Sequence, residues 1–149
     1  PDPPHVLTSN AGWSIADNIT QLREVIAIIN SYGVRTSLFI DPDNFSTKDI
    51  ALITSTKVNR VELYTEDYAD CYGTDKFHTT LEHYKKTAEI ISKLGIEINA
   101  GHDLNLDNLR TFITKIPHVK EVSIGHALIC DSLKYGLKET IRRYLECLK

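Results

Sequence analysis

Apolar residues along the chain follow two different spacings, which predict two kinds of element. Four short runs are rich in β-branched and aromatic side chains, which suit a pleated sheet. These runs predict strands over residues 34–40, 60–65, 96–100 and 121–124.

Between these runs, apolar residues recur at the three- and four-residue spacing of a helix face. Leu22, Ile26 and Ile29 show it in the first segment, where Gly33 is a suitable stop, and Ser46 is a plausible N-cap for the second. Leu137, Ile141, Tyr144, Leu145 and Leu148 form one such face in the last segment. The pattern predicts helices over residues 18–33, 46–54, 77–95, 106–117, 128–135 and 137–149.

The predicted order is one helix followed by repeated strand–helix units. This alternation indicates an α/β fold in which parallel strands are joined by right-handed crossovers. The carboxyl ends of parallel strands meet at one edge of the sheet, which is where α/β folds bind ligands. That edge would carry Asp41, Thr65 with Glu66, residues 99–103, and Gly125 with His126.

Composition limits the classes of function. With 42% hydrophobic and 25% charged residues, the 149-residue chain is typical of one globular domain or part of one. Its formal net charge is -3 and it has no basic block, which argues against a nucleic-acid-binding face. No apolar run approaches the length of a membrane helix. The three cysteines lack metal-site or disulfide spacing and indicate reduced thiols in a cytoplasmic protein. Because no methionine occurs, we expect residues before Pro1.

Two Gly-His pairs follow predicted strands and are the leading candidates for a site. An imidazole titrates near neutral pH, so His102 after Gly101 is a candidate acid–base group; the alternative is a histidine packed at a strand end. Gly125 and His126 precede a short predicted helix, whose first N–H groups would suit an anion; the alternative is a plain turn.

Other polar residues are less specific. Thr8 offers a hydroxyl in a glycine-containing loop, where helix capping is the simpler interpretation. Glu62 and Tyr64 share one face of a predicted strand, and a buried glutamate there would need a partner. No Walker loop, G-x-G-x-x-G or Ser-His-Asp signature is present.

Four segments, in order, resemble the pyridoxine 5'-phosphate synthase family of vitamin B6 biosynthesis: SLFIDPD, VELYTEDYAD, INAGHDLNLDNL and VSIGHALI. The opening PDPPHVLTSNAGW also fits the loop after that family's fourth strand. The resemblance implies a (β/α)₈ TIM barrel, of which residues 1–149 would be the second half, strands five to eight with their helices. The amino-terminal half of that single domain would then be absent from this chain.

The resemblance also implies a reaction without metal or organic cofactor. The family condenses 3-amino-2-oxopropyl phosphate with 1-deoxy-D-xylulose 5-phosphate, releasing inorganic phosphate and water. By motif, His102 matches the proton donor. Asp103, Gly125 and His126 match contacts to the aminoketone phosphate, and Thr8 matches a contact to the deoxyxylulose phosphate. Family members are homo-oligomers, commonly octamers, that act on small phosphorylated substrates and require neither nucleic acid nor membrane.

Three residues depart from the family pattern. Asp103 stands where glycine is usual, which would put a carboxylate beside a phosphate, and Tyr64 and Glu66 replace a frequent histidine and glycine. The family's remaining acid–base and binding residues lie in its first three strands, so we expect this chain alone to be inactive. The alternatives are a non-catalytic phosphate-binding α/β module and a structural remnant that pairs with a partner chain.

Overall fold

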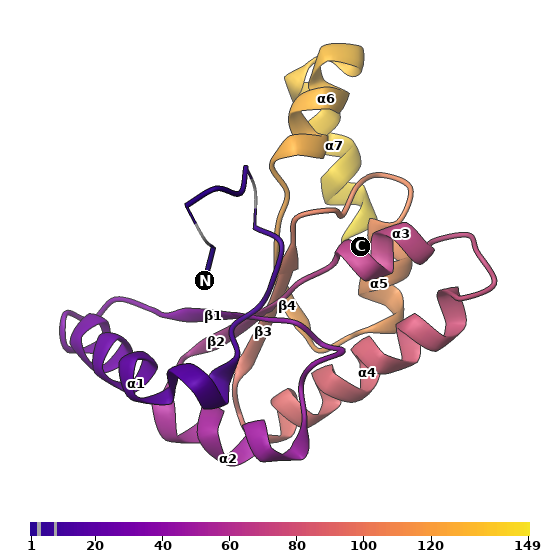
Figure 1. Ribbon diagram of the computed structural model, residues 1–149. Helices are drawn as coiled ribbons and strands as arrows, with labels where there is room; N and C mark the ends of the chain where they lie inside the picture. Colours follow the sequence, from indigo (N-terminus) through magenta and orange to yellow (C-terminus); the bar gives the residue numbers. More distant parts are fainter. Residues whose placement is uncertain (3, 8) are drawn as a thin grey trace.

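The computed structural model describes residues 1–2, 4–7 and 9–149 and shows a single four-stranded sheet in the order β1-β2-β3-β4. All three strand pairs are parallel, as the strand–helix alternation predicted. The strands are β1 (Ser37–Ile40), β2 (Arg60–Leu63), β3 (Glu97–Gly101) and β4 (Val119–Ser123). Each sequence-neighbouring pair is also adjacent in the sheet, so the chain advances one strand at a time (Figure 1).

The helices connect the strands and close the chain. They are α1 (Ile15–Ser31), α2 (Thr47–Thr56), α3 (Glu66–Cys71), α4 (Phe77–Lys93), α5 (Leu109–Lys115), α6 (His126–Tyr135) and α7 (Leu137–Cys147). Helix α3 is the one element that the sequence pattern did not predict, because six residues are too few to show a helical period. The predicted N-cap Ser46 is confirmed, since it forms a reciprocal capping box with Asp49.

The core lies between one face of the sheet and the helices. Leu38, Ile40, Val61, Leu63 and Ile98 alternate along the strands and are buried with the apolar faces of α1, α2 and α4. Three aromatic residues join the helices beside the sheet: the rings of Tyr68 and Phe112 are 4.7 Å apart, and those of Tyr84 and Phe112 are 5.9 Å apart. These contacts fix α3, α4 and α5 against the strands that carry the site.

The intervening strand residues place polar side chains on the opposite face of the sheet. Arg60 on β2 forms ion pairs with Glu97 on β3, at 2.6 Å, and with Glu121 on β4. One layer further toward the carboxyl ends, the cross-strand register aligns Glu62 with Asn99. This face therefore carries a polar network that leads to the carboxyl edge.

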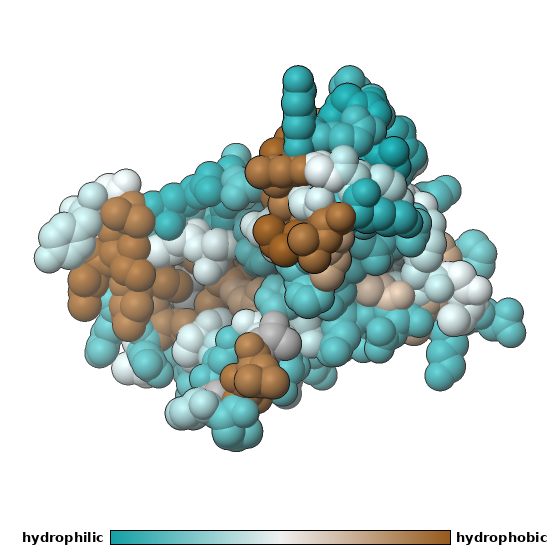
Figure 2. Space-filling view, turned by 90° about the horizontal axis from the view of Figure 1, so that it is seen from above, coloured by the Kyte–Doolittle hydropathy of each residue, from teal (hydrophilic) through white to brown (hydrophobic). Residues whose placement is uncertain are grey.

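Two groups of apolar side chains remain exposed on the surface. One follows α1 and its carboxyl end (Val25, Ile28, Tyr32 and Val34) and the other follows α6 and α7 (Ile129, Leu133, Leu137, Ile141, Leu145 and Leu148). Figure 2 shows brown apolar patches over separate parts of the molecule. The apolar stripe predicted for residues 137–149 thus lies largely at the surface. Only Tyr144 of this stripe is among the buried residues of α7, and the other buried residue of the helix is Thr140. No helix in the described part of the chain is both long and apolar enough to cross a membrane.

Candidate functional site

A cavity of about 670 Å³ lies at the carboxyl ends of β2, β3 and β4. It is lined by Glu62, His102, Asp103, Asn105, Ser123, Gly125, His126 and Ala127. The parallel sheet therefore brings His102 and the Gly125-His126 pair to one cavity, although His102 and His126 are 24 positions apart in the sequence. Four of the five residues singled out by motif line it, whereas Thr8 lies outside the described residues.

His102 is held at the first position beyond β3. Its backbone N–H donates to the carbonyl oxygen of Ser123 at 3.2 Å, which extends the ladder between β3 and β4 by one residue. Its φ of 65° lies in the left-handed region, which costs a non-glycine residue free energy and is often found at functional sites. The chain therefore turns away from the direction of β3 at His102, and the half-buried imidazole lies at the cavity.

Gly101 is required by the close approach of its neighbours. A Cβ at this position would lie 2.4 Å from the carbonyl oxygen of Ser123 and 3.2 Å from Oε1 of Glu62. Since real Cβ contacts do not approach 2.4 Å, only glycine fits without moving β4. The tight packing of β3 against β4 thus explains the glycine before His102.

Gly125 and His126 occupy the start of helix α6. Gly125 is the N-cap and His126 is the first residue of this ten-residue helix. The unpaired backbone N–H groups of a helix N-terminus carry partial positive charge and favour an anion. No atom lies within 4 Å of a Cβ built on Gly125, so packing does not require glycine there.

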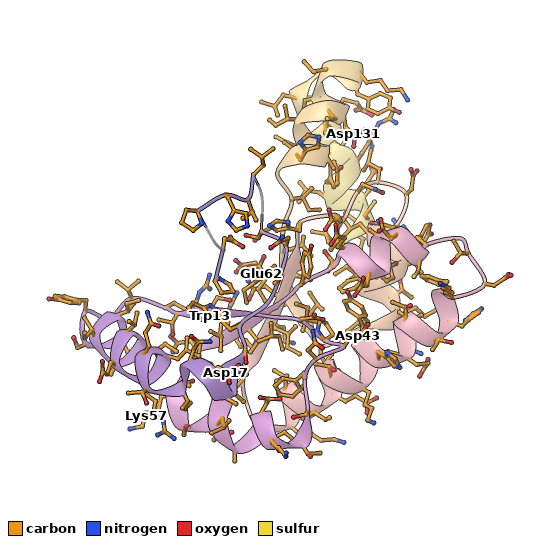
Figure 3. The ribbon with its side chains drawn as sticks, in the orientation of Figure 1. Trp13, Asp17, Asp43, Lys57, Glu62 and Asp131 are labelled. Atoms are coloured by element: carbon orange, nitrogen blue, oxygen red, sulfur yellow. The ribbon has the colours of Figure 1, made fainter. Side chains whose placement is uncertain are left out.

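Glu62 brings a half-buried carboxylate to the same cavity (Figure 3). Its Oε2 accepts a hydrogen bond from Nδ2 of Asn99 at 2.8 Å, and Oδ1 of Asn99 in turn accepts one from Ser37 at 3.2 Å. Burial raises the pKa of Glu62, while His102 and the bond from Asn99 oppose that shift. Glu62 and His102 therefore line the same cavity and interact electrostatically.

Asp103 also lines the cavity and is half-buried. Burial raises its pKa, the nearby Glu66 and Asp70 raise it further, and His102 opposes the shift. Asp103 therefore lies among other carboxylates, whereas the first N–H groups of α6 carry partial positive charge.

The partial burial of Glu62 predicts a specific pH dependence of stability. A carboxyl group whose pKa is raised on folding binds its proton more tightly in the folded state, so stability falls as pH rises through the interval between the two pKa values. Glu62→Gln should therefore stabilise the chain near pH 7 and have little effect at low pH. Urea unfolding from pH 3.5 to 8 measures this difference, with Glu24→Gln on the exposed face of α1 as the control. An equal effect of Glu62→Gln at all pH values would contradict the assignment.

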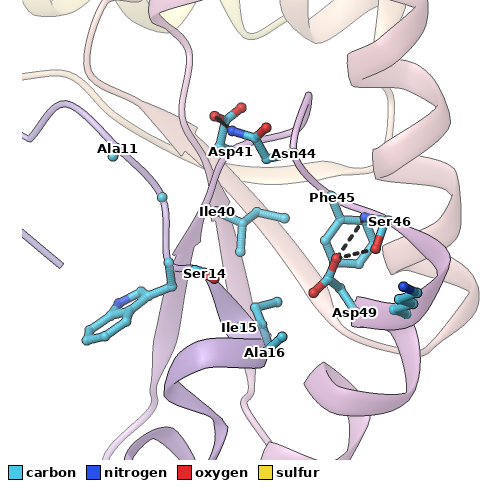
Figure 4. Close-up of a pocket in the computed structure, with 13 residues that line it drawn as sticks. Ala11, Ser14, Ile15, Ala16, Ile40, Asp41, Asn44, Phe45, Ser46 and Asp49 are labelled. Carbon is cyan, nitrogen blue, oxygen red and sulfur yellow. Dashed lines mark hydrogen bonds between the residues drawn. The ribbon is translucent and has the colours of Figure 1, made fainter.

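A second pocket, of about 420 Å³, lies between the amino-terminal loop, the end of β1 and the start of α2 (Figure 4). Four of its polar side chains are bonded in pairs: Asn44 Nδ2 donates to Asp41, and Ser46 Oγ donates to Asp49 at 2.6 Å. These bonds make a turn and a helix cap. In the chain that the structure describes, no three His, Cys, Asp or Glu side chains gather closely enough to hold a metal ion.

Sequence reasoning missed several residues of the site. Asn105 and Ser123 were not singled out, Asn99 was placed at the carboxyl edge only as part of residues 99–103, and Glu62 was noted without a role. The two-residue period of a strand predicts the face on which Glu62 lies in its own strand, and it puts Asn99 and Gly101 on one face of theirs. Only the pairing of β2 with β3 shows that Glu62 lies beside Asn99. That register is not readable from either segment alone.

Comparison with known proteins identifies the family of the chain. The family model described as "Pyridoxal phosphate biosynthesis protein PdxJ" matches residues 1–149. Among curated relatives, the pyridoxine 5'-phosphate synthase of Porphyromonas gingivalis is 49% identical over 99% of this chain and 60% of its own length. The synthase of Parabacteroides distasonis is 46% identical with the same coverage, and that of Albidiferax ferrireducens is 44% identical over 99% of the chain and 58% of its own length.

The chain spans about three fifths of the length of these curated relatives. A solved radical S-adenosylmethionine methyltransferase from Kitasatospora setae is similar over 75% of the chain and 24% of its own, with 14% identity and a TM-score of 0.47, which is too distant to bear on fold or function. The whole-chain family match and the high identity lead to one conclusion: this chain belongs to the pyridoxal phosphate biosynthesis protein PdxJ family.

Proposed function

We propose that residues 1–149 form the carboxyl-terminal half of a pyridoxine 5'-phosphate synthase, with β1 to β4 as strands five to eight of a (β/α)₈ barrel. The complete enzyme would condense 3-amino-2-oxopropyl phosphate with 1-deoxy-D-xylulose 5-phosphate to give pyridoxine 5'-phosphate, phosphate and water. The observation that carries the proposal is the shared cavity of His102 and the α6 N-terminus in a chain of this family. Acid–base groups and an anion site are what a condensation of two phosphate esters requires.

Five of the cavity residues, and Thr8, have a role in this proposal. His102 is the general acid that protonates a leaving oxygen, and Glu62 faces it and balances the charge of the imidazolium that forms or is consumed. Gly125 and His126 hold the phosphate of the aminoketone at the first N–H groups of α6. Asp103 contacts the same substrate away from its phosphate. Thr8 would contact the deoxyxylulose phosphate.

The roles need no metal and no organic cofactor, because proton transfer and phosphate binding account for every residue named. The remaining acid–base and binding groups of the family would come from the preceding half of the barrel. That half would also cover the exposed apolar side chains of α1 and α7 and the two free sheet edges. We therefore expect an oligomer of complete barrels, an octamer as in the family, and no turnover by the 149-residue chain alone.

A chimera tests the function directly. The matching three fifths of the Porphyromonas gingivalis synthase would be replaced with this chain, and pyridoxine 5'-phosphate would be measured by its fluorescence after addition of both substrates. We expect product from the chimera and none from the isolated chain. A folded chimera that binds phosphate esters in a calorimeter without forming product would favour a non-catalytic binding module instead. A chimera that binds no phosphate ester would indicate a structural remnant.

A further inference from the structure

We propose that Phe39 and Tyr64 are positioning residues that hold the imidazole of His102 in the orientation it needs at the cavity. They stand at the carboxyl ends of β1 and β2, and His102 follows β3. Three neighbouring strands thus contribute one ring each to a cluster that we call the aromatic bracket: Phe39, Tyr64 and His102.

Ring geometry is the main evidence for the bracket. The centroid of the imidazole lies 5.7 Å from that of Phe39 and 6.1 Å from that of Tyr64, with the tyrosine ring edge-on at 80°. The rings of Phe39 and Tyr64 lie 5.3 Å from each other. All three separations fall in the range of attractive aromatic contacts. Each ring therefore packs against the other two, and the imidazole has a defined position between its neighbours.

His102 needs such support because its backbone does not supply it. Its φ of 65° is unfavourable for a residue with a Cβ, and its backbone hydrogen bond to Ser123 fixes the peptide rather than the ring. A half-buried imidazole at the rim of a cavity would otherwise rotate among several side-chain conformations. The two aromatic rings restrict that rotation.

Hydrogen bonds in turn fix Tyr64 from three directions. The hydroxyl of buried Tyr84 donates to the backbone oxygen of Tyr64 at 2.7 Å, and the N–H of Tyr64 donates to Ile40 at 2.9 Å. The hydroxyl of Tyr64 donates to Glu66. Burial and this bond raise the pKa of Tyr64, so the hydroxyl keeps its proton at neutral pH. The adjacent Thr65, fully buried, donates to the carbonyl oxygen of Gly101 and so ties β2 to the residue before His102.

Glu66, two residues after Tyr64, is the partner that holds the tyrosine ring, because the two side chains bond to each other. The pair is exposed to different degrees, since Tyr64 is 7% exposed whereas Glu66 is at the surface. Tyr64, held in place by its hydrogen bond to the carboxylate of Glu66, therefore supports His102 in this chain.

Proton NMR of the 149-residue chain tests the positioning without reference to any activity. In the wild type we expect the ring protons of His102 to be shifted by the two aromatic rings away from those of exposed His5. Tyr64→Leu and Phe39→Leu should each move them toward the His5 values, whereas Tyr64→Phe keeps the ring and should preserve most of the shift. Tyr32→Leu on the exposed end of α1 is the control. Unchanged His102 signals in both leucine variants would overturn the proposal.

The kinetic part of the inference rests on the proposed function. In the chimera, Tyr64→Leu should lower kcat by about 10- to 100-fold with little change in KM, since a misplaced catalytic group loses about that much activity. Tyr64→Phe should retain most of the wild-type kcat. An unchanged kcat in Tyr64→Leu would contradict a positioning role. If the wild-type chimera forms no product, the proposed function fails, and the NMR result alone decides whether the bracket holds His102. Phe39→Leu provides the same NMR comparison should Tyr64→Leu fail to fold.

Discussion

Replacing Gly101 with alanine should lower the free energy of unfolding by about 2–3 kcal/mol, the cost of overpacking a well-packed site. The same replacement at Gly125 should cost less than about 1 kcal/mol, which is the range for a changed N-cap. The two substitutions add one methyl group each, at glycines that both precede a histidine. Their difference comes from what surrounds the new Cβ: the Ser123 carbonyl oxygen at 2.4 Å in the first case, and no atom within 4 Å in the second.

Urea unfolding followed by circular dichroism measures both variants against the wild type. The Gly101→Ala variant should also lose the His102 N–H bond to Ser123, because β4 must move to admit the methyl group. Hydrogen exchange at His102 reports that loss. Equal stability of the two alanine variants would mean that β3 and β4 do not approach as closely as the structure has them.

This pair of glycines also shows what the sequence could and could not predict. Both Gly-His segments looked alike as strand ends, and the rule that parallel strands share a carboxyl edge correctly placed them at one cavity. The reasons for the two glycines differ, however, and depend on atoms from other strands. Gly101 is fixed by Ser123 of β4, a contact that no local pattern encodes.

The fold was easier to predict than the site for a similar reason. Strand and helix positions follow from local spacing, so the four strands, their order and the capping of α2 at Ser46 were correct. The short helix α3 was missed because it has less than two turns. The aromatic bracket was missed because Phe39 looks like an ordinary strand residue and Tyr64 was noted without a link to His102. The pairing of β1, β2 and β3 is what brings the three rings together.

The proposed general acid makes the sharpest functional prediction. In the chimera, His102→Asn should lower kcat by about 10²- to 10⁴-fold, the usual contribution of a positioned acid or base. Asparagine is a suitable replacement because it tolerates the left-handed backbone that His102 adopts, with φ of 65°. It also retains polar hydrogen-bonding atoms but does not transfer a proton near neutral pH. Loss of activity would then reflect the missing proton transfer rather than a damaged fold.

Steady-state kinetics with both substrates separate this role from substrate binding. His126→Asn, at the first residue of α6, should mainly raise KM for the aminoketone phosphate, because it would remove the proposed contact to the phosphate in both the ground state and the transition state. His78→Asn on the exposed surface of α4 is the control and should change neither constant. If His102→Asn retains more than about a tenth of the wild-type kcat, a loss too small for a missing general acid, His102 is not the proton donor. Glu62, whose carboxyl pKa is raised by burial in the same cavity, would then be the next candidate for the acid–base role.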